Sequence, residues 1–189
     1  MTADSASETG DELIALAARL EFVLVPGFKD SGPEHWQSFW QRKIPVFRRI
    51  TQHRWDDPDV EHWVHAINRL LETHTRPAVL IGHSLGALAC ACVAGDGHPR
   101  VAGLMLVAPA EPARFEADAR VPQRNLGAPT LVAASEDDPL MSMTRAQHWA
   151  QVWGADLVDL GEAGHINAEA GFGPWPHGLE LLARLARRI

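Results

Sequence analysis

Short apolar runs separated by amphipathic segments repeat along most of the chain. Residues 78–81 are a compact run with β-branched members, as expected for a strand that is covered on both faces of a parallel sheet. Comparable runs occupy residues 22–25, 101–107, 130–134 and 156–160, and residues 46–52 form the weakest candidate. The alternation predicts an α/β fold in which a doubly wound, mostly parallel sheet has about five or six strands.

The segments between these runs carry apolar residues at helical spacing. Asp57 and Pro58 suit the cap and the first position of a helix that extends to Glu72 and has one strongly apolar face. Ser142 and Gly154 bracket another helix in the same way. Further helices are predicted from Pro33 onward, directly after Ser84, and over residues 179–189.

The start of the chain does not fit the alternating pattern. Residues 1–20 are therefore interpreted as an N-terminal extension, with residues 1–9 disordered and residues 12–20 forming a short helix. Residues 21–189 then form one domain, because a chain of 189 residues is of ordinary single-domain size. Nothing in the sequence indicates the role of the extension.

The charge balance excludes several classes of partner. Seventeen basic and 24 acidic residues give a formal net charge of −7 without a basic cluster, so nucleic acid and anionic membrane surfaces are poor partners. No apolar run approaches the ~20 residues of a membrane span, and the N-terminus lacks a cationic start. Cys90 and Cys92 cannot pair on one helix and are typical of small core residues in a reducing compartment. We therefore expect a soluble, cytoplasmic protein.

One short segment combines a strand end, a turn and a helix start. Gly82, Ser84 and Gly86 match the pattern G-x-S-x-G, in which a serine stands exposed on a strained turn between a buried strand and a helix. The N–H of Leu85 is then an unpaired amide at the positive end of that helix, where an oxyanion would form. The alternative is a surface serine in an ordinary turn, but the flanking strand and the small-residue helix favour a nucleophile.

A serine nucleophile needs a neighbouring base and an acid that orients the base. Two acidic candidates, Asp137 and Asp138, follow one predicted strand, and His165 follows the last one. The order serine, acid, histidine is that of hydrolases with this fold. Because the carboxyl ends of parallel strands build the sites of such sheets, these residues are predicted to meet Ser84. The spacing alone does not decide between the two aspartates.

Other histidines among the ten in the chain need separate interpretations. His83, locked beside the serine, is interpreted as a packing or hydrogen-bonding residue rather than a base. His35 follows the loop after the first strand and either lines the pocket or has a structural role. His62 and His65 are spaced i, i+3, but no further ligand completes a metal site, so no metal and no cofactor is expected. In that first loop, Phe28 is assigned through its N–H as the second oxyanion donor.

Four segments of the chain together resemble a known family. They are VPGFKDSGPEHWQSFW, GHSLG, ASEDDPLMS and WGADLVDLGEAGHINAEAGFGPWPHG, and they resemble the small serine hydrolases related to retinoblastoma-binding protein nine and bacterial YdeN over about residues 22–189. The resemblance implies a minimal α/β hydrolase without a lid, with Ser84 as nucleophile, Asp138 as acid and His165 as base. It also implies hydrolysis of carboxylic esters. The N-terminal extension is the main departure.

The sequence therefore predicts a serine esterase that forms an acyl-enzyme on small carboxylic esters. A peptidase or a thioesterase uses the same groups and remains an alternative, as does a hydrolase-like binding module with little turnover. Residues 110–128 are too few for a separate lid domain, so a shallow pocket walled by Phe28, His35 and Trp175 is expected. The physiological substrate and the oligomeric state are left open.

Overall fold

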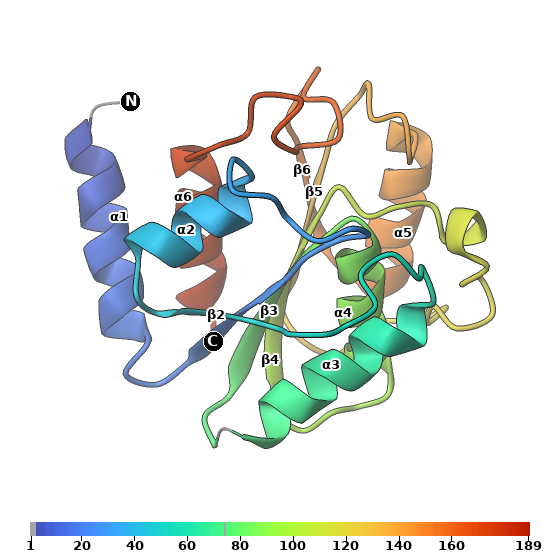
Figure 1. The fold of residues 1–189 in the computed structure, drawn as a ribbon, viewed down its shortest axis with the longest axis horizontal. Coiled ribbons are helices and arrows are strands. Elements are labelled where there is room, and N and C mark those ends of the chain that lie inside the picture. Colours follow the sequence, from blue (N-terminus) through green and yellow to red (C-terminus); the bar gives the residue numbers. More distant parts are fainter. Residues whose placement is uncertain (1–2, 74) are drawn as a thin grey trace.

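A six-stranded sheet in which all strands are parallel forms the centre of the molecule (Figure 1). The computed structural model describes residues 3–73 and 75–189. The strands are β1 (Glu21–Val25), β2 (Phe47–Arg49), β3 (Ala78–His83), β4 (Val101–Val107), β5 (Thr130–Ala134) and β6 (Asp156–Asp159), in the order β2-β1-β3-β4-β5-β6. The α/β prediction is confirmed, including the weakest strand candidate, which is the edge strand β2.

Helices cover both faces of this sheet (Figure 1). The helices of one face are α3 (Val60–Glu72), α4 (Leu85–Gly95) and α5 (Met143–Trp153), and those of the other are α1 (Ala3–Leu16), α2 (Trp36–Lys43) and α6 (Pro176–Ala186). Alternate strand residues divide between the two layers: Val23 and Leu80 belong to the core beside α3, whereas Phe22 and Val79 belong to the core beside α6. This division explains why the central strands carry apolar residues at consecutive positions, whereas the edge strands β2 and β6 include charged residues.

The helix that follows Ser84 is almost completely buried. From Leu85 to Ala94, every residue of α4 is inaccessible to solvent or nearly so, and the helix packs against α3, β3 and β4. Cys90 and Cys92 are buried and unpaired, and burial raises the pKa of Cys92 to about 12. Both cysteines are therefore core thiols rather than nucleophiles.

The N-terminal segment differs from the expectation. α1 is helical from Ala3, whereas the sequence pattern predicts disorder through residue 9, and residues 1 and 2 lie outside the described part of the chain. The helix is anchored further on, because Leu13 is fully buried and α1 packs against α6. At the other end of the chain, α6 begins at Pro176, before the predicted start at Leu179, with the proline at a first-turn position.

The connection between β4 and β5 is short. Within the described residues, its regular structure consists of one 3-10 helix, η1 (Pro112–Phe115), so this connection forms no separate lid domain. Of the helices in residues 3–73 and 75–189, none has the length and apolar character needed to span a bilayer.

Candidate active site

Ser84 lies on a tight turn between β3 and α4. Its backbone has φ 56° and ψ −122°, a strained combination for a residue with a Cβ. The two glycines of the motif are required by close contact. A Cβ on Gly82 would lie 2.6 Å from the Cα of Ala87, and a Cβ on Gly86 would lie 2.3 Å from the carbonyl oxygen of Pro26. The turn that the G-x-S-x-G pattern predicts is therefore present, and it places the serine at the carboxyl edge of the sheet.

Two backbone segments meet beside Ser84. Leu85 is the first residue of α4, so its N–H has no acceptor within the helix. The loop after β1 approaches the turn so closely that a Cβ on Gly27 would lie 2.9 Å from the Cβ of Ser84. Phe28, the next residue of that loop, lines the same cavity as Ser84. The fold thus brings the two expected oxyanion donors to the serine.

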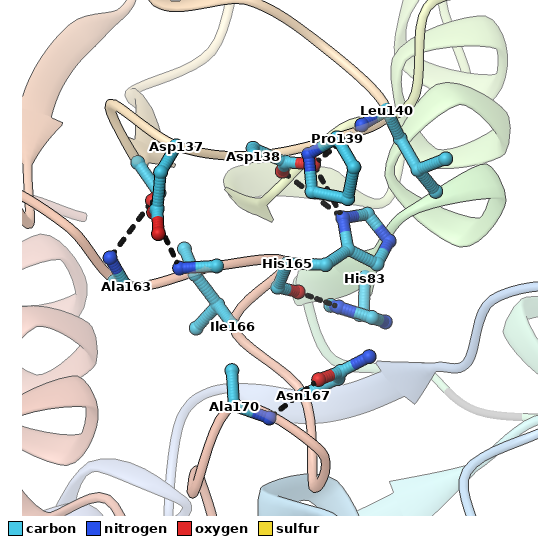
Figure 2. A network of polar contacts seen from close by, with 12 residues as sticks. His83, Asp137, Asp138, Pro139, Leu140, Ala163, His165, Ile166, Asn167 and Ala170 are labelled. Atoms are coloured by element: carbon cyan, nitrogen blue, oxygen red, sulfur yellow. Dashed lines mark hydrogen bonds and ion pairs between the residues drawn. The ribbon is translucent and has the colours of Figure 1, made fainter.

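His165 and Asp138 are in direct contact (Figure 2). The Nδ1 atom of His165 lies 3.0 Å from both carboxylate oxygens of Asp138. The side chain of His165 is 12% exposed and that of Asp138 is 3% exposed, so water screens this contact poorly. Because an ionised carboxylate can only accept hydrogen bonds, the neutral imidazole of His165 carries its proton on Nδ1 in this contact, and Nε2 then has a lone pair. The imidazole is therefore held in the tautomer that can receive a proton at Nε2.

Asp137 and Asp138 are adjacent in the sequence but contact different groups (Figure 2). The carboxylate of Asp137 accepts hydrogen bonds from the Ser135 hydroxyl and from the Gly164 N–H, both at 2.7 Å. These bonds lower the pKa of Asp137, the Ser135 hydroxyl having the larger effect. Asp137 therefore holds the loop that carries His165, and no signal in the sequence pointed to that role.

The loop around His165 is fixed by hydrogen bonds from distant segments. Gly164 and Ile166 both have positive φ, at 55° and 47°, so the loop has a tightly turned backbone. The carbonyl of His165 lies 2.9 Å from Nε2 of His83 (Figure 2), and the carbonyl of Ile166 accepts a 3.0 Å hydrogen bond from Nε1 of Trp36. Since a carbonyl cannot donate, His83 donates through Nε2. Burial and then the nearby His35 and His165 lower the pKa of His83 well below its usual value, so His83 is a neutral hydrogen-bond donor here.

A cavity of about 280 Å³ is lined by several of the candidate residues, although Asp138 and Leu85 are not among them. Ser84 and His165 both line it, together with Phe28 and His35 as expected. Four of its other lining residues, Phe115, Leu140, Asn167 and Glu169, were not found by sequence reasoning, because they come from connections whose course depends on tertiary packing.

Trp175 does not join the residues that line this cavity, contrary to the expectation. Its side chain is buried among other rings, stacked on Trp40 at 5.8 Å and edge-on to Trp36 at 5.2 Å between ring centroids. Trp175 has a φ of 41° directly before α6, and a Cβ on Gly178 would lie 2.4 Å from its ring. This backbone turn places the indole under the first turn of α6, where it is part of the core.

His35 lines the cavity and also caps α2. Its Nδ1 accepts a 3.2 Å hydrogen bond from the N–H of Gln37, and its residue exposure is only 6%. Burial, followed by the charges of Arg49 and His165, lowers the pKa of His35 to about 3. The side chain is therefore neutral at ordinary pH and carries its proton on Nε2, which has no hydrogen-bond partner among the described residues. The sequence left two roles open for His35, and the structure shows both: His35 caps α2 through the hydrogen bond from Gln37, and it lines the cavity.

The fold and this arrangement define an α/β hydrolase: a parallel sheet with helices on both faces and a serine on the turn after the strand β3. The model of the family described as serine hydrolase matches residues 22–184, and the chain therefore belongs to that serine hydrolase family. Membership of this family makes the protein a hydrolase. No curated protein matches the chain.

Solved structures agree with this assignment. A YdeN-like hydrolase from Pectobacterium atrosepticum is 54% identical over 95% of this chain and 97% of its own, with a TM-score of 0.93. The ydeN product of Bacillus subtilis is 21% identical over 88% and 98% of the two chains, with a TM-score of 0.73. Est1E from Butyrivibrio proteoclasticus, solved with ferulic acid, is 12% identical over 90% and 87%, with a TM-score of 0.64. The last two similarities show the fold alone.

Proposed function

We propose that this hydrolase cleaves small carboxylic esters through an acyl-enzyme on Ser84. The observation that carries the proposal is the contact of Asp138 with Nδ1 of His165, which leaves Nε2 of His165 as a base in the cavity that Ser84 also lines. In the first step the oxygen of Ser84 attacks the ester carbonyl while His165 takes its proton. His165 then returns that proton to the departing alcohol.

The second half of the reaction repeats the same proton transfers with water. His165 removes a proton from a water molecule, the resulting hydroxide attacks the acyl-enzyme, and the proton passes to Ser84 as the carboxylic acid leaves. Asp138 keeps the imidazole in the required tautomer and stabilises its charged form in this poorly solvated place. All steps balance with water as the only co-reactant, so the proposal needs no metal and no cofactor.

The negative oxygen of each tetrahedral intermediate would be stabilised by backbone amides. Leu85 offers the first free N–H of α4, at the positive end of the helix dipole. Phe28 offers an N–H from the loop that lies against Ser84 through Gly27. Removal of one such donor in related chemistry costs about 10²–10³ in rate, so these amides would be a major contribution.

The proposed partner is a small ester rather than a polymer or a membrane. The cavity of about 280 Å³ is the size of a small acyl group with part of its alcohol, and the net charge of −7 disfavours polyanionic partners. The unpaired thiols of Cys90 and Cys92 agree with a reducing compartment, and we place the protein in the cytoplasm on that ground.

A fluorophosphonate probe tests the nucleophile directly. We expect the probe to label Ser84 and no other residue, with the adduct located by mass spectrometry. Ser84→Ala should abolish labelling and lower p-nitrophenyl acetate hydrolysis by about 10³-fold or more. Labelling of the alanine variant would contradict the proposal, whereas labelling of Ser84 without turnover of esters, thioesters or peptides would indicate a binding module.

A further inference from the structure

A second cavity, of about 170 Å³, shares no lining residue with the one that contains Ser84. Three of its residues, Gln52, His53 and Arg54, follow the edge strand β2. The others lie on α3 at i, i+3 and i+7, which places them on one side of that helix. They are His62, His65 and Arg69.

The chemistry of this cavity wall is unusual for so acidic a chain. Five of its six lining residues are arginines or histidines, and the sixth is a glutamine, so no carboxylate lines the cavity. Arg69 donates one hydrogen bond to the carbonyl of Thr51 at 3.0 Å, and Arg54 pairs with Asp57 at 2.7 Å. Each guanidinium group has five N–H donors, so these contacts leave most of the donors available.

Polar atoms at this cavity lack partners. Both side-chain amide atoms of Gln52 and Nδ1 of His62 are buried without a hydrogen bond, and they are three of the five such atoms found in the described residues. The nearest acidic oxygen to Nδ1 of His62 is on Asp57, at 3.7 Å, too far for a hydrogen bond. Buried polar groups normally have hydrogen-bond partners, so a polar occupant of the cavity could supply the ones that these atoms lack.

A metal ion does not suit this cavity as well as an anion does. His62 and His65 have ligand-like spacing, but residues 3–73 and 75–189 contain no group of three or more histidine, cysteine or acidic side chains arranged to hold a metal. The positive charges of Arg54 and Arg69 would also repel a cation. The residues that line this cavity instead carry guanidinium, amide and imidazole groups, which are common ligands of phosphate and carboxylate.

We propose that this cavity is an oxyanion-binding site for a small phosphate or carboxylate ligand, with Arg54 and Arg69 as its charged donors and Gln52 as its neutral one. This proposal does not depend on the proposed ester hydrolysis, because the two cavities share no lining residue.

Titration with inorganic phosphate, followed by ¹H–¹⁵N NMR of the full chain at constant ionic strength, tests the proposal. We expect saturable shifts at residues 52–54 and 62–69 with one-site behaviour, and the same residues to respond to acetate if carboxylates are also bound. The double variant Arg54→Gln/Arg69→Gln should raise the dissociation constant at least tenfold.

The matched control removes two exposed arginines elsewhere. Arg124→Gln/Arg188→Gln lowers the net charge equally, and we expect less than a twofold change in the dissociation constant. Equal weakening in both double variants would show a general charge effect and overturn the proposal, as would non-saturable or scattered shifts in the wild type. Zinc-induced shifts at His62 and His65 without any phosphate response would reassign the cavity to a metal.

Discussion

At the scale of single residues, the site depends on where neighbouring side chains point. Asp138 contacts the imidazole of His165, whereas Asp137 accepts hydrogen bonds from Ser135 and Gly164. The two carboxylates are adjacent in sequence but act on different parts of one loop. Their substitution should therefore have separable effects.

We expect Asp138→Asn to lower kcat by up to about 10⁴-fold, because an amide that donates to Nδ1 would stabilise the wrong tautomer of His165. Asp137→Asn should lower kcat less than about tenfold, since the remaining amide oxygen can still accept the hydrogen bond from Gly164. Initial rates with p-nitrophenyl acetate measure both effects. The reverse order of the two losses would assign the acid to Asp137.

A second residue-scale prediction concerns pH and stability. The pKa of His35 is lowered to about 3 in the folded protein, so the unfolded chain binds a proton at His35 more readily than the folded protein does. The stability contributed by the neutral imidazole is complete above pH 6.5 and is lost as pH falls from 6.5 toward 3.

His35→Asn should remove this loss, because asparagine caps a helix and does not titrate. Urea unfolding across that range should show a pH slope smaller by up to about 1.4 kcal/mol per pH unit than in the wild type. His53→Asn is the control, since His53 is exposed and lies outside the cavity that His35 lines. An unchanged slope in His35→Asn would show that His35 is protonated in the fold.

At the scale of elements, the site is set by how closely backbones approach one another. α4 can start directly behind Ser84 only because Gly86 allows the loop after β1 to pass against it. The same loop supplies Phe28. Gly86 is therefore needed for the close packing of α4 against the loop after β1, in addition to its place in the turn.

Gly86→Ala should cost more than about 2 kcal/mol of unfolding free energy, because its methyl group would lie 2.3 Å from backbone oxygens that cannot move independently. Gly32→Ala is a matched control, since a Cβ at Gly32 has no heavy atom within 4 Å, and its effect should stay within about 0.5 kcal/mol. Denaturant unfolding of both variants measures the difference. Equal stability of the two variants would mean that the turn at Ser84 relaxes easily to accept the methyl group.

At the scale of the whole molecule, the described residues, 3–73 and 75–189, form no separate lid domain. In this part of the chain the connection from β4 to β5 has η1 as its one regular element, and Phe115 of η1 packs on Phe28 with ring centroids 6.2 Å apart. This aromatic pair forms part of a small cavity instead of a deep channel. Long acyl chains would therefore remain largely in water.

We expect kcat/KM to be highest for acetyl to butyryl p-nitrophenyl esters and to be flat or falling beyond about six carbons. Each CH₂ that is buried contributes ~0.8 kcal/mol, and a cavity of about 280 Å³ cannot bury many of them. A series of esters from two to sixteen carbons, measured below and above micelle formation, tests this. A steady rise toward the longest chains, or activation at the lipid interface, would contradict the lidless interpretation.

The sequence by itself determined the features that depend on local pattern. Apolar runs specify strands because a strand covered on both faces is apolar at consecutive positions. G-x-S-x-G specifies the turn at Ser84 because glycine alone fits its two crowded positions, Gly82 and Gly86. The positions of Ser84 and His165 follow from these local rules together with the parallel topology, which collects the ends of strands at one edge.

Only the tertiary structure decided the features that depend on contacts between distant segments. Which aspartate contacts His165 depends on the meeting of two loops: Asp137 accepts hydrogen bonds from Ser135 and Gly164, and Asp138 contacts the imidazole. The loop of His165 is itself held by His83 and Trp36, which lie far away in the sequence. Trp175 was expected to line the pocket, but the backbone turn before α6 directs its side chain into the core, where it contacts Trp36 and Trp40. Hydrophobic pattern fixes which residues are buried, whereas side-chain direction in loops is set by backbone turns and hydrogen bonds that form only when the whole chain has packed.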